Sequence, residues 1–529
     1  MQQRERAGSG RATRLAGSLL SGFLLVLCFP KPHLSFLAVV ALLPLLLAIF
    51  AERQRRWLFL YGYLTGIIFL AGTMPWVYSV MLTFGRLSAP LAAGVFFLFV
   101  IVMALFFGLY SWWVGELARR SQTVALLLAP VIWVAMELLR THLITGVPWN
   151  LLGYAWAKHP ELIQVASWTG IYGVSFLMAV VNTALAAVWV VRTRRALLLV
   201  SAVILLVAAL VVARAHLPPA APTATALLVQ TNLPQLSSYE PNWVLNHQDE
   251  LLELYRRTAA AATAQTPRPS LVLWPEVPAP LYFHHDPLLR AQLMALAQTA
   301  QAHLLVGFVD YRKDAEGRDR PYNSALMLAP DGGFVGQYDK IHLVPFGEYV
   351  PWRWLLRFSG RLVAEVSDFA PGSSKTLLPM GHGRAAVMIC YEAIFPGLVG
   401  SFVARGADVL VNISNDGWFG NSAAPAQHFN MARVRAVETR RYLLRTTNTG
   451  ITAVIDPHGR VLAQAPTEQR TVLVAGFAPR RERTFYVRYG DWFAWLCLLV
   501  GLVALARILW LNAVEARSYA DDRRTRTTL

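Results

Sequence analysis

The sequence has few charged residues and few cysteines for its length. Only 15% of its 529 residues are Asp, Glu, Lys or Arg, whereas 55% are hydrophobic and the mean hydropathy is +0.42. Soluble domains are usually about 25% charged and about 45–50% apolar, so a single soluble protein is excluded. Three cysteines cannot form a disulfide framework. We also find no internal repeat and no collagen-like glycine period, which leaves a chain with more than one folding unit.

Long apolar runs fill the first 215 residues and return near the C-terminus. A helix of roughly 20 apolar residues crosses a bilayer, because lipid offers no hydrogen-bond partner to free backbone groups. We predict about eight spans, and we expect the first to be retained because it ends in CFPKP at 28–32 with no small-residue cleavage pattern. The predicted spans are 15–29, 34–50, 57–76, 88–114, 122–139, 164–191, 196–214 and 491–512.

Acidic residues are scarce beside basic ones, 31 against 48, and arginines account for much of the formal net charge of +17. With eight spans every arginine cluster falls on one side, which the positive-inside rule makes cytoplasmic. Both termini are then cytoplasmic. Much of the positive charge reflects membrane topology and therefore gives no support to nucleic-acid binding. The clusters lie within 4–14, 53–56, 119–120, 192–195 and 523–526.

The chain therefore divides into four parts. We expect seven transmembrane helices in 1–215, an exported domain in 216–490, an eighth helix in 491–513 and a cytoplasmic tail in 514–529. The exported part alternates short apolar runs with helical periodicity, which is typical of an α/β fold. The strand candidates are 226–230, 271–274, 304–309, 325–329, 385–389 and 409–413, with a late hairpin around 451–455, and the helix candidates are 243–264, 287–302 and 425–441.

Cys390 is the one cysteine of the exported part, since Cys28 and Cys497 fall inside predicted spans, where they are expected to pack. It ends an apolar strand, and strand C-termini are where sites form in open α/β sheets. An inert buried cysteine remains an alternative. A reactive thiol would need a base to deprotonate it and donors for the charge that it later creates.

Two other places supply such groups. Glu276 directly follows the apolar strand LVLWP at 271–275, and Lys340 and Glu348 lie in the proline-bounded stretch YDKIHLVPFGEYVP at 338–351. Taken singly, each is compatible with a solvated surface residue. Together, a Glu, a Lys and a Cys in the contexts WPE, YDK and CYE resemble the catalytic triad of the nitrilase superfamily.

Further motifs narrow the resemblance. The sequence is similar to the apolipoprotein N-acyltransferase family, and the likeness covers nearly the whole chain, including the eight-span layout. The motifs are QTNLPQ at 230–235, YDKIHLVPFGEYVP at 338–351, ICYEAIFP at 389–396, SNDGWFG at 414–420, QH at 427–428, NTGITA at 448–453 and GVPW at 146–149.

The resemblance implies an αββα sandwich for the exported domain and a role for each matched residue. Cys390 matches the nucleophile, Glu276 the general base, and Lys340 the group that stabilises the oxyanion. Glu348 and Glu392 match residues that support the triad, and Tyr391 matches a functionally important neighbour. Where the family often has a substrate-handling Trp, this sequence has Tyr239.

The implied reaction is acyl transfer in two steps. Cys390 would take an acyl chain from a phospholipid as a thioester, and the α-amine of a diacylglyceryl-cysteine apolipoprotein would then accept it as an amide. The partners are the phospholipid donor, the apolipoprotein acceptor and the bilayer of a bacterial inner membrane, with the catalytic domain periplasmic. No cofactor is implied, and the sequence has no ligand cluster with zinc spacing.

The segment 351–363 is rich in Trp, Arg and apolar residues, which suits a helix lying in the membrane interface. We hypothesise that it forms a lid containing Trp352, and that Trp418 and Phe419 line the same mouth. An amphipathic helix packed on the exported core is the alternative for this segment, and buried packing is the alternative for the two aromatic residues.

Two other functions stay open at this point. A membrane-tethered nitrilase-type amidase would share the triad but would not need eight spans. A transporter with an exported accessory domain would place ionisable residues in mid-span and show repeated halves. Glu116, Glu137 and Arg140 instead lie near predicted span ends, and transport should survive a substitution at Cys390.

Overall fold

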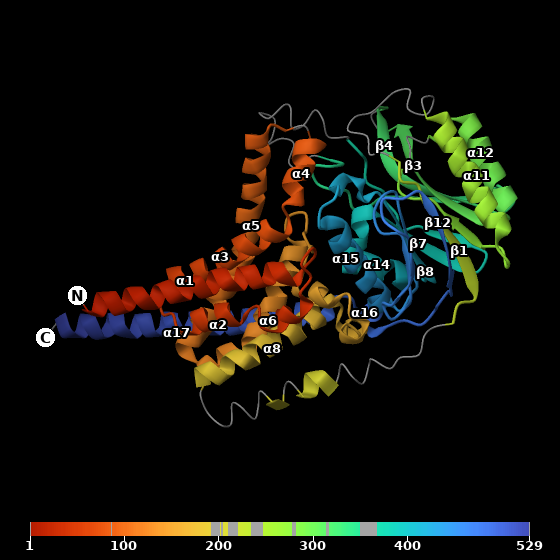
Figure 1. Ribbon diagram of the computed structural model, residues 1–529. Helices are drawn as coiled ribbons and strands as arrows, with labels where there is room; N and C mark the ends of the chain where they lie inside the picture. Colours follow the sequence, from red (N-terminus) through yellow and green to blue (C-terminus); the bar gives the residue numbers. More distant parts are fainter. Residues whose placement is uncertain are drawn as a thin grey trace.

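The computed structural model has a helical bundle at one end and an α/β domain at the other, with both chain termini at the far end of the bundle (Figure 1). It describes residues 2–85, 87–191, 201–202, 205–209, 221–233, 247–277, 282–313, 317–349 and 368–527. Tyr239, Trp352, the lid segment 351–363 and most of the predicted span 196–214 lie outside these ranges.

Within the described ranges, five helices are long and apolar enough to cross a membrane, or six if the bent pair α3 and α4 forms one span. The pair bends by 52° at the break before Trp76. The predicted span 34–50 is too short to count by itself, because it divides into a 3₁₀ turn, Ser35–Val39, and the helix α2. The bundle helices are α1 (Gln2–Cys28), α2 (Leu43–Phe50), α3 (Arg55–Thr73), α4 (Trp76–Thr83), α5 (Ala89–Arg120), α6 (Gln122–His142), α8 (Ile171–Val191) and α17 (Trp492–Thr527).

Ion pairs join the arginine clusters at the end of the bundle that carries the termini. Each pair connects segments far apart in the sequence, so the arginine clusters in the first half of α1, at the start of α3 and at the end of α5 lie together. This is the arrangement that the positive-inside pattern predicts for one face of the membrane. The pairs are Arg14–Glu52 at 2.5 Å, Arg55–Glu116 at 2.9 Å and Arg120–Glu515 at 2.5 Å.

The α/β domain consists of two six-stranded sheets, with strand orders β12-β1-β2-β3-β4-β5 and β11-β10-β9-β8-β7-β6. Every predicted strand is present, and β5, β6, β9 and β12 are additional. The strands are β1 (Ala224–Gln230), β2 (Leu271–Leu273), β3 (His303–Lys313), β4 (Asp319–Leu328), β5 (Phe334–Asp339), β6 (Leu377–Met380), β7 (Gly383–Ile389), β8 (Val409–Ser414), β9 (Leu443–Thr447), β10 (Ala453–Ile455), β11 (Val461–Gln464) and β12 (Thr471–Phe477).

Helices cover the outer face of each sheet, so the predicted αββα sandwich is confirmed. The helices α11 (Gln248–Ala264) and α12 (Pro287–Ala300) pack on the first sheet, while α14 (Pro396–Ala404) and α15 (Ala424–Thr439) pack on the second. Apolar residues of both sheets meet in one core between them. On its other side α15 contacts the short helix α7 (Ala166–Thr169), which places the second sheet against the bundle.

Candidate active site

Three predicted site residues follow the ends of three strands and come together where the two sheets meet. Glu276 follows β2 of the first sheet, Lys340 follows β5 of the same sheet, and Cys390 follows β7 of the second sheet. All three are buried, and Lys340 Nζ lies 3.4 Å from Glu276 Oε1. Gly307 of β3 permits this, because a Cβ there would lie 2.9 Å from the Glu276 Cα.

Glu348, which the sequence analysis expected to support the triad, lies beside the same lysine. Lys340 Nζ donates to Glu348 Oε1 at 2.8 Å, and the Val344 N–H donates to Glu348 Oε2 at 2.8 Å. Burial by itself would lower the pKa of Lys340, but the carboxylates of Glu348 and Glu276 outweigh burial and raise the pKa of this lysine. The ammonium is therefore charged at neutral pH.

Asn323 of β4 bridges the two carboxylates, and the sequence analysis did not identify this residue. Its Nδ2 donates to Glu276 Oε1 and to Glu348 Oε1, both at 2.8 Å. The second oxygen of Glu276 accepts from the Asn415 N–H at 2.9 Å. Both carboxylates are thus fixed by neutral donors as well as by Lys340, and Glu276 cannot turn away from the site without losing hydrogen bonds.

Cys390 adopts a left-handed backbone conformation, with φ of 52°, at the turn from β7 into the 3₁₀ segment Cys390–Ile394. Residues other than glycine rarely adopt this conformation, and it occurs often at functional sites. Burial raises the pKa of the Cys390 thiol, and the charge of Glu276 raises it further, whereas Lys340 opposes both. The resting sulfur is a thiol, so chemistry at this residue needs a base that takes its proton.

Glu392 ties the Lys340 loop to the Cys390 turn. Its Oε1 accepts from the Tyr338 hydroxyl at 2.7 Å and from the Ile341 N–H at 2.8 Å, and its Oε2 accepts from the Ile389 N–H at 2.8 Å. The side chain is fully buried. Burial raises the pKa of Glu392, and these donors oppose that shift. Glu392 therefore joins two segments of the site, the loop that carries Lys340 and the turn that carries Cys390.

A chain of buried polar residues lies behind Cys390, and the sequence analysis assigned no role to its members. His428 Nε2 donates to the Cys390 carbonyl oxygen at 3.0 Å, and its Nδ1 lies 3.0 Å from Asp416 Oδ1. Arg445 Nη2 in turn donates to Asp416 Oδ2 at 2.8 Å. Burial raises the pKa of Asp416, but Arg445 and His428 outweigh burial and lower it. This chain fixes the backbone of the Cys390 turn from within the second sheet.

Tyr391 and the loop after α6 meet at the edge of the site. The Tyr391 hydroxyl donates to the Gly146 carbonyl at 3.4 Å, and the Tyr391 ring packs edge-on against Phe395 with centroids 5.0 Å apart. Gly146 begins the GVPW motif, whose Trp149 stacks on the His428 ring at 5.9 Å. The membrane bundle therefore supplies part of the wall around Cys390.

Trp418 and Phe419 both contact the bundle. Phe419 is half-buried, with ring centroids 5.0 Å from Trp76 and 6.1 Å from Trp149. Trp418 is 39% exposed and lies edge-on against Phe84 at 4.9 Å. Phe419 thus packs in the interface between the two domains, whereas Trp418 leaves a surface available for a ligand.

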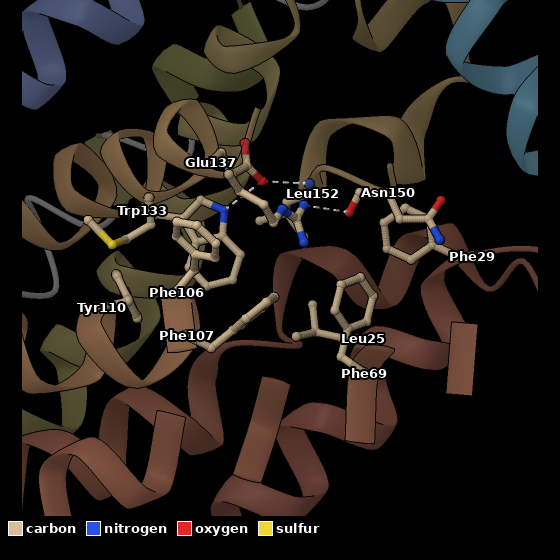
Figure 2. Close-up of a pocket in the computed structure, with 12 residues that line it drawn as sticks. Leu25, Phe29, Phe69, Phe106, Phe107, Tyr110, Trp133, Glu137, Asn150 and Leu152 are labelled. Carbon is tan, nitrogen blue, oxygen red and sulfur yellow. Dashed lines mark hydrogen bonds between the residues drawn. The ribbon is translucent and has the colours of Figure 1, made fainter. Parts of the chain in front are cut away.

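An apolar cavity lies inside the bundle, with Phe69, Phe107 and Leu25 on one side and a polar end near Glu137 (Figure 2). Glu137 Oε1 accepts from the Trp133 indole at 3.0 Å and from the Leu152 N–H at 2.7 Å. This carboxylate fixes the loop that follows GVPW. Across the described ranges, no group of three or more His, Cys, Asp or Glu residues could hold a metal ion.

Family models and curated relatives match almost the whole chain. The model of the apolipoprotein N-acyltransferase N-terminal domain matches residues 21–184, and that of carbon-nitrogen hydrolase matches 231–484. The apolipoprotein N-acyltransferase of Geobacter metallireducens is 39% identical over 92% of this chain and 94% of its own length. The chain belongs to the apolipoprotein N-acyltransferase family. The enzyme of the same name from Methylococcus capsulatus is 34% identical over 92% of this chain and 94% of its own length.

Membership of this family makes the protein an acyltransferase with a nitrilase-like domain. Solved structures similar to the α/β domain include Saccharomyces cerevisiae Nit3 of the nitrilase superfamily, at 23% identity over 49% of this chain and 91% of that chain, with a TM-score of 0.37. An amidase from Nesterenkonia is also similar, at 19% identity over 50% of this chain and 95% of that chain, with a TM-score of 0.36.

Proposed function

We propose that this acyltransferase moves a fatty acyl chain from a membrane phospholipid to the N-terminal α-amine of a diacylglyceryl-cysteine apolipoprotein. One observation carries the proposal: a buried Glu276–Lys340 pair lies with Cys390 where the two sheets meet. The names of the relatives supply the acceptor class. The domain limits 1–215, 216–490, 491–513 and 514–529 are part of the proposal, as is a bacterial inner membrane with cytoplasmic termini and a periplasmic catalytic domain.

In the first step, Glu276 takes the Cys390 thiol proton as the sulfur attacks an ester carbonyl of the phospholipid. Lys340 donates a hydrogen bond to the oxyanion that forms, and such a donor typically contributes about 10²–10³ in rate. The carbon–oxygen bond then breaks, the leaving alkoxide takes the proton from Glu276, and a lysophospholipid departs. The acyl chain remains on Cys390 as a thioester.

In the second step, the α-amine of the apolipoprotein attacks the thioester carbonyl and gives up a proton to Glu276. The carbon–sulfur bond breaks, the amide leaves with the acceptor, and the proton returns to the Cys390 sulfur. Glu348 and Glu392 position Lys340, and Tyr391 is a third supporting residue, while Trp418 and Phe419 are the described residues proposed to contact the lipids. Tyr239 and Trp352 complete that proposed set, outside the described ranges.

The test is intact mass spectrometry of the purified protein after incubation with a diacyl phospholipid. We expect a gain of one acyl mass that hydroxylamine reverses and that Cys390→Ala abolishes. Cys497→Ala is the matched control, because it removes a thiol inside α17 and should keep the adduct. If wild type and both variants stay unmodified with every phospholipid, the proposal is wrong, and turnover of a small amide would instead identify a tethered amidase.

A further inference from the structure

A second cavity, of about 620 Å³, lies at the opposite ends of the strands that lead to the active site. Cys390 follows the C-terminal end of β7, whereas this cavity opens at the N-terminal ends of β7 and β8, beside Gly383 and Asp408. It is therefore separate from the acyl-transfer site. Its lining is Met380, Gly381, Gly383, Arg384, Val403, Gly406, Asp408, Arg441, Arg481 and Arg483.

The lining carries four arginines and a single carboxylate, that of Asp408. Arg441 is buried and forms part of the floor, with its guanidinium donating to the backbone carbonyls of Ala407, Thr439 and Glu482. Arg481 and Arg483 are exposed and have fewer hydrogen-bond partners. Arg481 is 90% exposed, with its Nε 3.7 Å from Asp408 Oδ1, and one Arg483 nitrogen donates to the Ala404 carbonyl.

Arg384 has no hydrogen bond or ion pair from its guanidinium to any residue that the structure describes. It lies directly over Gly406, where a Cβ would come within 2.2 Å of Arg384 Nη2. Gly406 has φ of 99°, so glycine is favoured there for its backbone as well as for the space. The cavity thus presents free guanidinium donors around a recess that can accept a compact anion.

Exposed aromatic side chains lie near this cavity, next to the start of the last span. Phe485 begins α16 (Phe485–Tyr489), two residues after Arg483, and stacks on Trp168 with centroids 5.5 Å apart. Trp168 is 49% exposed and Tyr489 is 60% exposed, immediately before α17 enters the bundle. Exposed aromatic residues at the end of a span are typical of the lipid headgroup region. Two extended residues cover about 7 Å, so Arg483 lies close to that region.

We infer that this cavity binds the phosphate of an anionic phospholipid in the outer leaflet and so holds the catalytic domain against the membrane. The positive-inside rule explains the arginines at the other end of the bundle but not four arginines that line one cavity of the α/β domain. Guanidinium groups match phosphate geometry and carry their charge permanently. The inference rests on the proposed placement of the catalytic domain at the outer surface of the membrane.

Native mass spectrometry of the full-length protein in detergent can count bound phosphatidylglycerol as this lipid is titrated. Each arginine near an anionic surface contributes about fivefold in binding, so Arg481→Gln/Arg483→Gln should weaken binding by about 25-fold. Both side chains are exposed, so the variant should fold. Arg256→Gln/Arg268→Gln removes the same charge from exposed sites on and after α11 and should bind as wild type does.

Unchanged affinity in Arg481→Gln/Arg483→Gln would overturn the inference, as would equal binding of phosphatidylcholine. Displacement of the lipid by millimolar inorganic phosphate would identify a free-anion site instead and would also overturn it. Thioester formation on Cys390, measured in the same preparations, keeps the two proposals apart. Absence of the thioester from wild type would refute the proposed function. Weaker phosphatidylglycerol binding by Arg481→Gln/Arg483→Gln, with thioester formation as in wild type, would show that the cavity binds lipid independently of the acyl-transfer reaction.

Discussion

Replacing His428 with Phe tests whether the polar chain behind the nucleophile positions it. The phenyl ring keeps the stacking surface for Trp149 but removes the Nε2–H that donates to the Cys390 carbonyl at 3.0 Å. Asp416 keeps Arg445 and the Ser414 hydroxyl as partners, so its carboxylate stays compensated. The principal loss is therefore one hydrogen bond at the turn that carries the thiol.

The size of the effect follows from the burial of that carbonyl. Leaving a buried acceptor unpaired costs about 1–3 kcal/mol, and Cys390 already holds a left-handed conformation that is costly for a residue with a side chain. The turn can avoid the cost by rotating the carbonyl, which moves the Cys390 sulfur away from Glu276 and Lys340. If this cost adds in full to the activation free energy of thioester formation, the rate of that step falls by about 5–150-fold.

Single-turnover acylation of Cys390, followed by intact mass, measures this rate directly. His428→Gln is the matched variant, because its amide can still donate to the carbonyl and should recover part of the loss. Alkylation of Cys390 in denaturant measures the total concentration of this thiol for each variant, and the acylation rate is normalised to it. A folded His428→Phe variant that acylates at the wild-type rate would show that the chain only packs and does not position the nucleophile.

Three further sets of substitutions test the surroundings of the site. Glu276→Gln should lower the pH at which iodoacetamide alkylates Cys390, because the Glu276 charge raises the pKa of that thiol. Lys340→Gln should raise this pH, because the Lys340 charge lowers the same pKa. A shift in the opposite direction in either variant would contradict this electrostatic account. Asn323→Leu removes a donor shared by two carboxylates, and each of the two hydrogen bonds is worth about 1.5–3 kcal/mol. The substitution should therefore lower both the melting temperature and the acylation rate. An unchanged acylation rate would show that Asn323 has no part in the reaction. Gln427→Leu should lower the melting temperature, because it leaves the Trp149 and Trp76 indole N–H groups without their acceptor, and an unchanged melting temperature would speak against these contacts.

Much of the fold could be predicted because most strands are short apolar runs next to turn residues. Two of the missed strands, β6 and β9, lack this signal, whereas β12 is an apolar run that the sequence analysis did not assign. β9 contains Arg445 and two threonines, all buried, and they are satisfied by partners that are distant in sequence or lie beyond a turn. β6 contains Pro379, which is tolerated because β6 lies at the edge of its sheet. Neither pairing can be read from local composition.

The same difference separates the predicted site residues from the missed ones. A strand that can be recognised in the sequence precedes Glu276 and another precedes Cys390. Lys340 lies within a motif that resembles a known family. Asn323 lies within β4, and nothing local distinguishes it from a polar residue on a solvated face. The span count differs for a related reason, because helix length and bends depend on packing, and the apolar run 34–50 is divided between a 3₁₀ turn and a short helix.

The site also depends on the bundle in a way that the sequence does not reveal. Gln427 and His428 are neighbours on α15, which is buried along nearly all of its length. Gln427 accepts from the Trp149 indole at 2.7 Å and donates to the Thr73 carbonyl at 2.9 Å, both in the bundle, while His428 holds the Cys390 carbonyl. A displacement of the bundle against α15 must therefore move the group that fixes the nucleophile. A tethered hydrolase of small amides would need no such connection, whereas an enzyme whose lipid substrates stay in the bilayer requires its nucleophile to be held in register with the membrane.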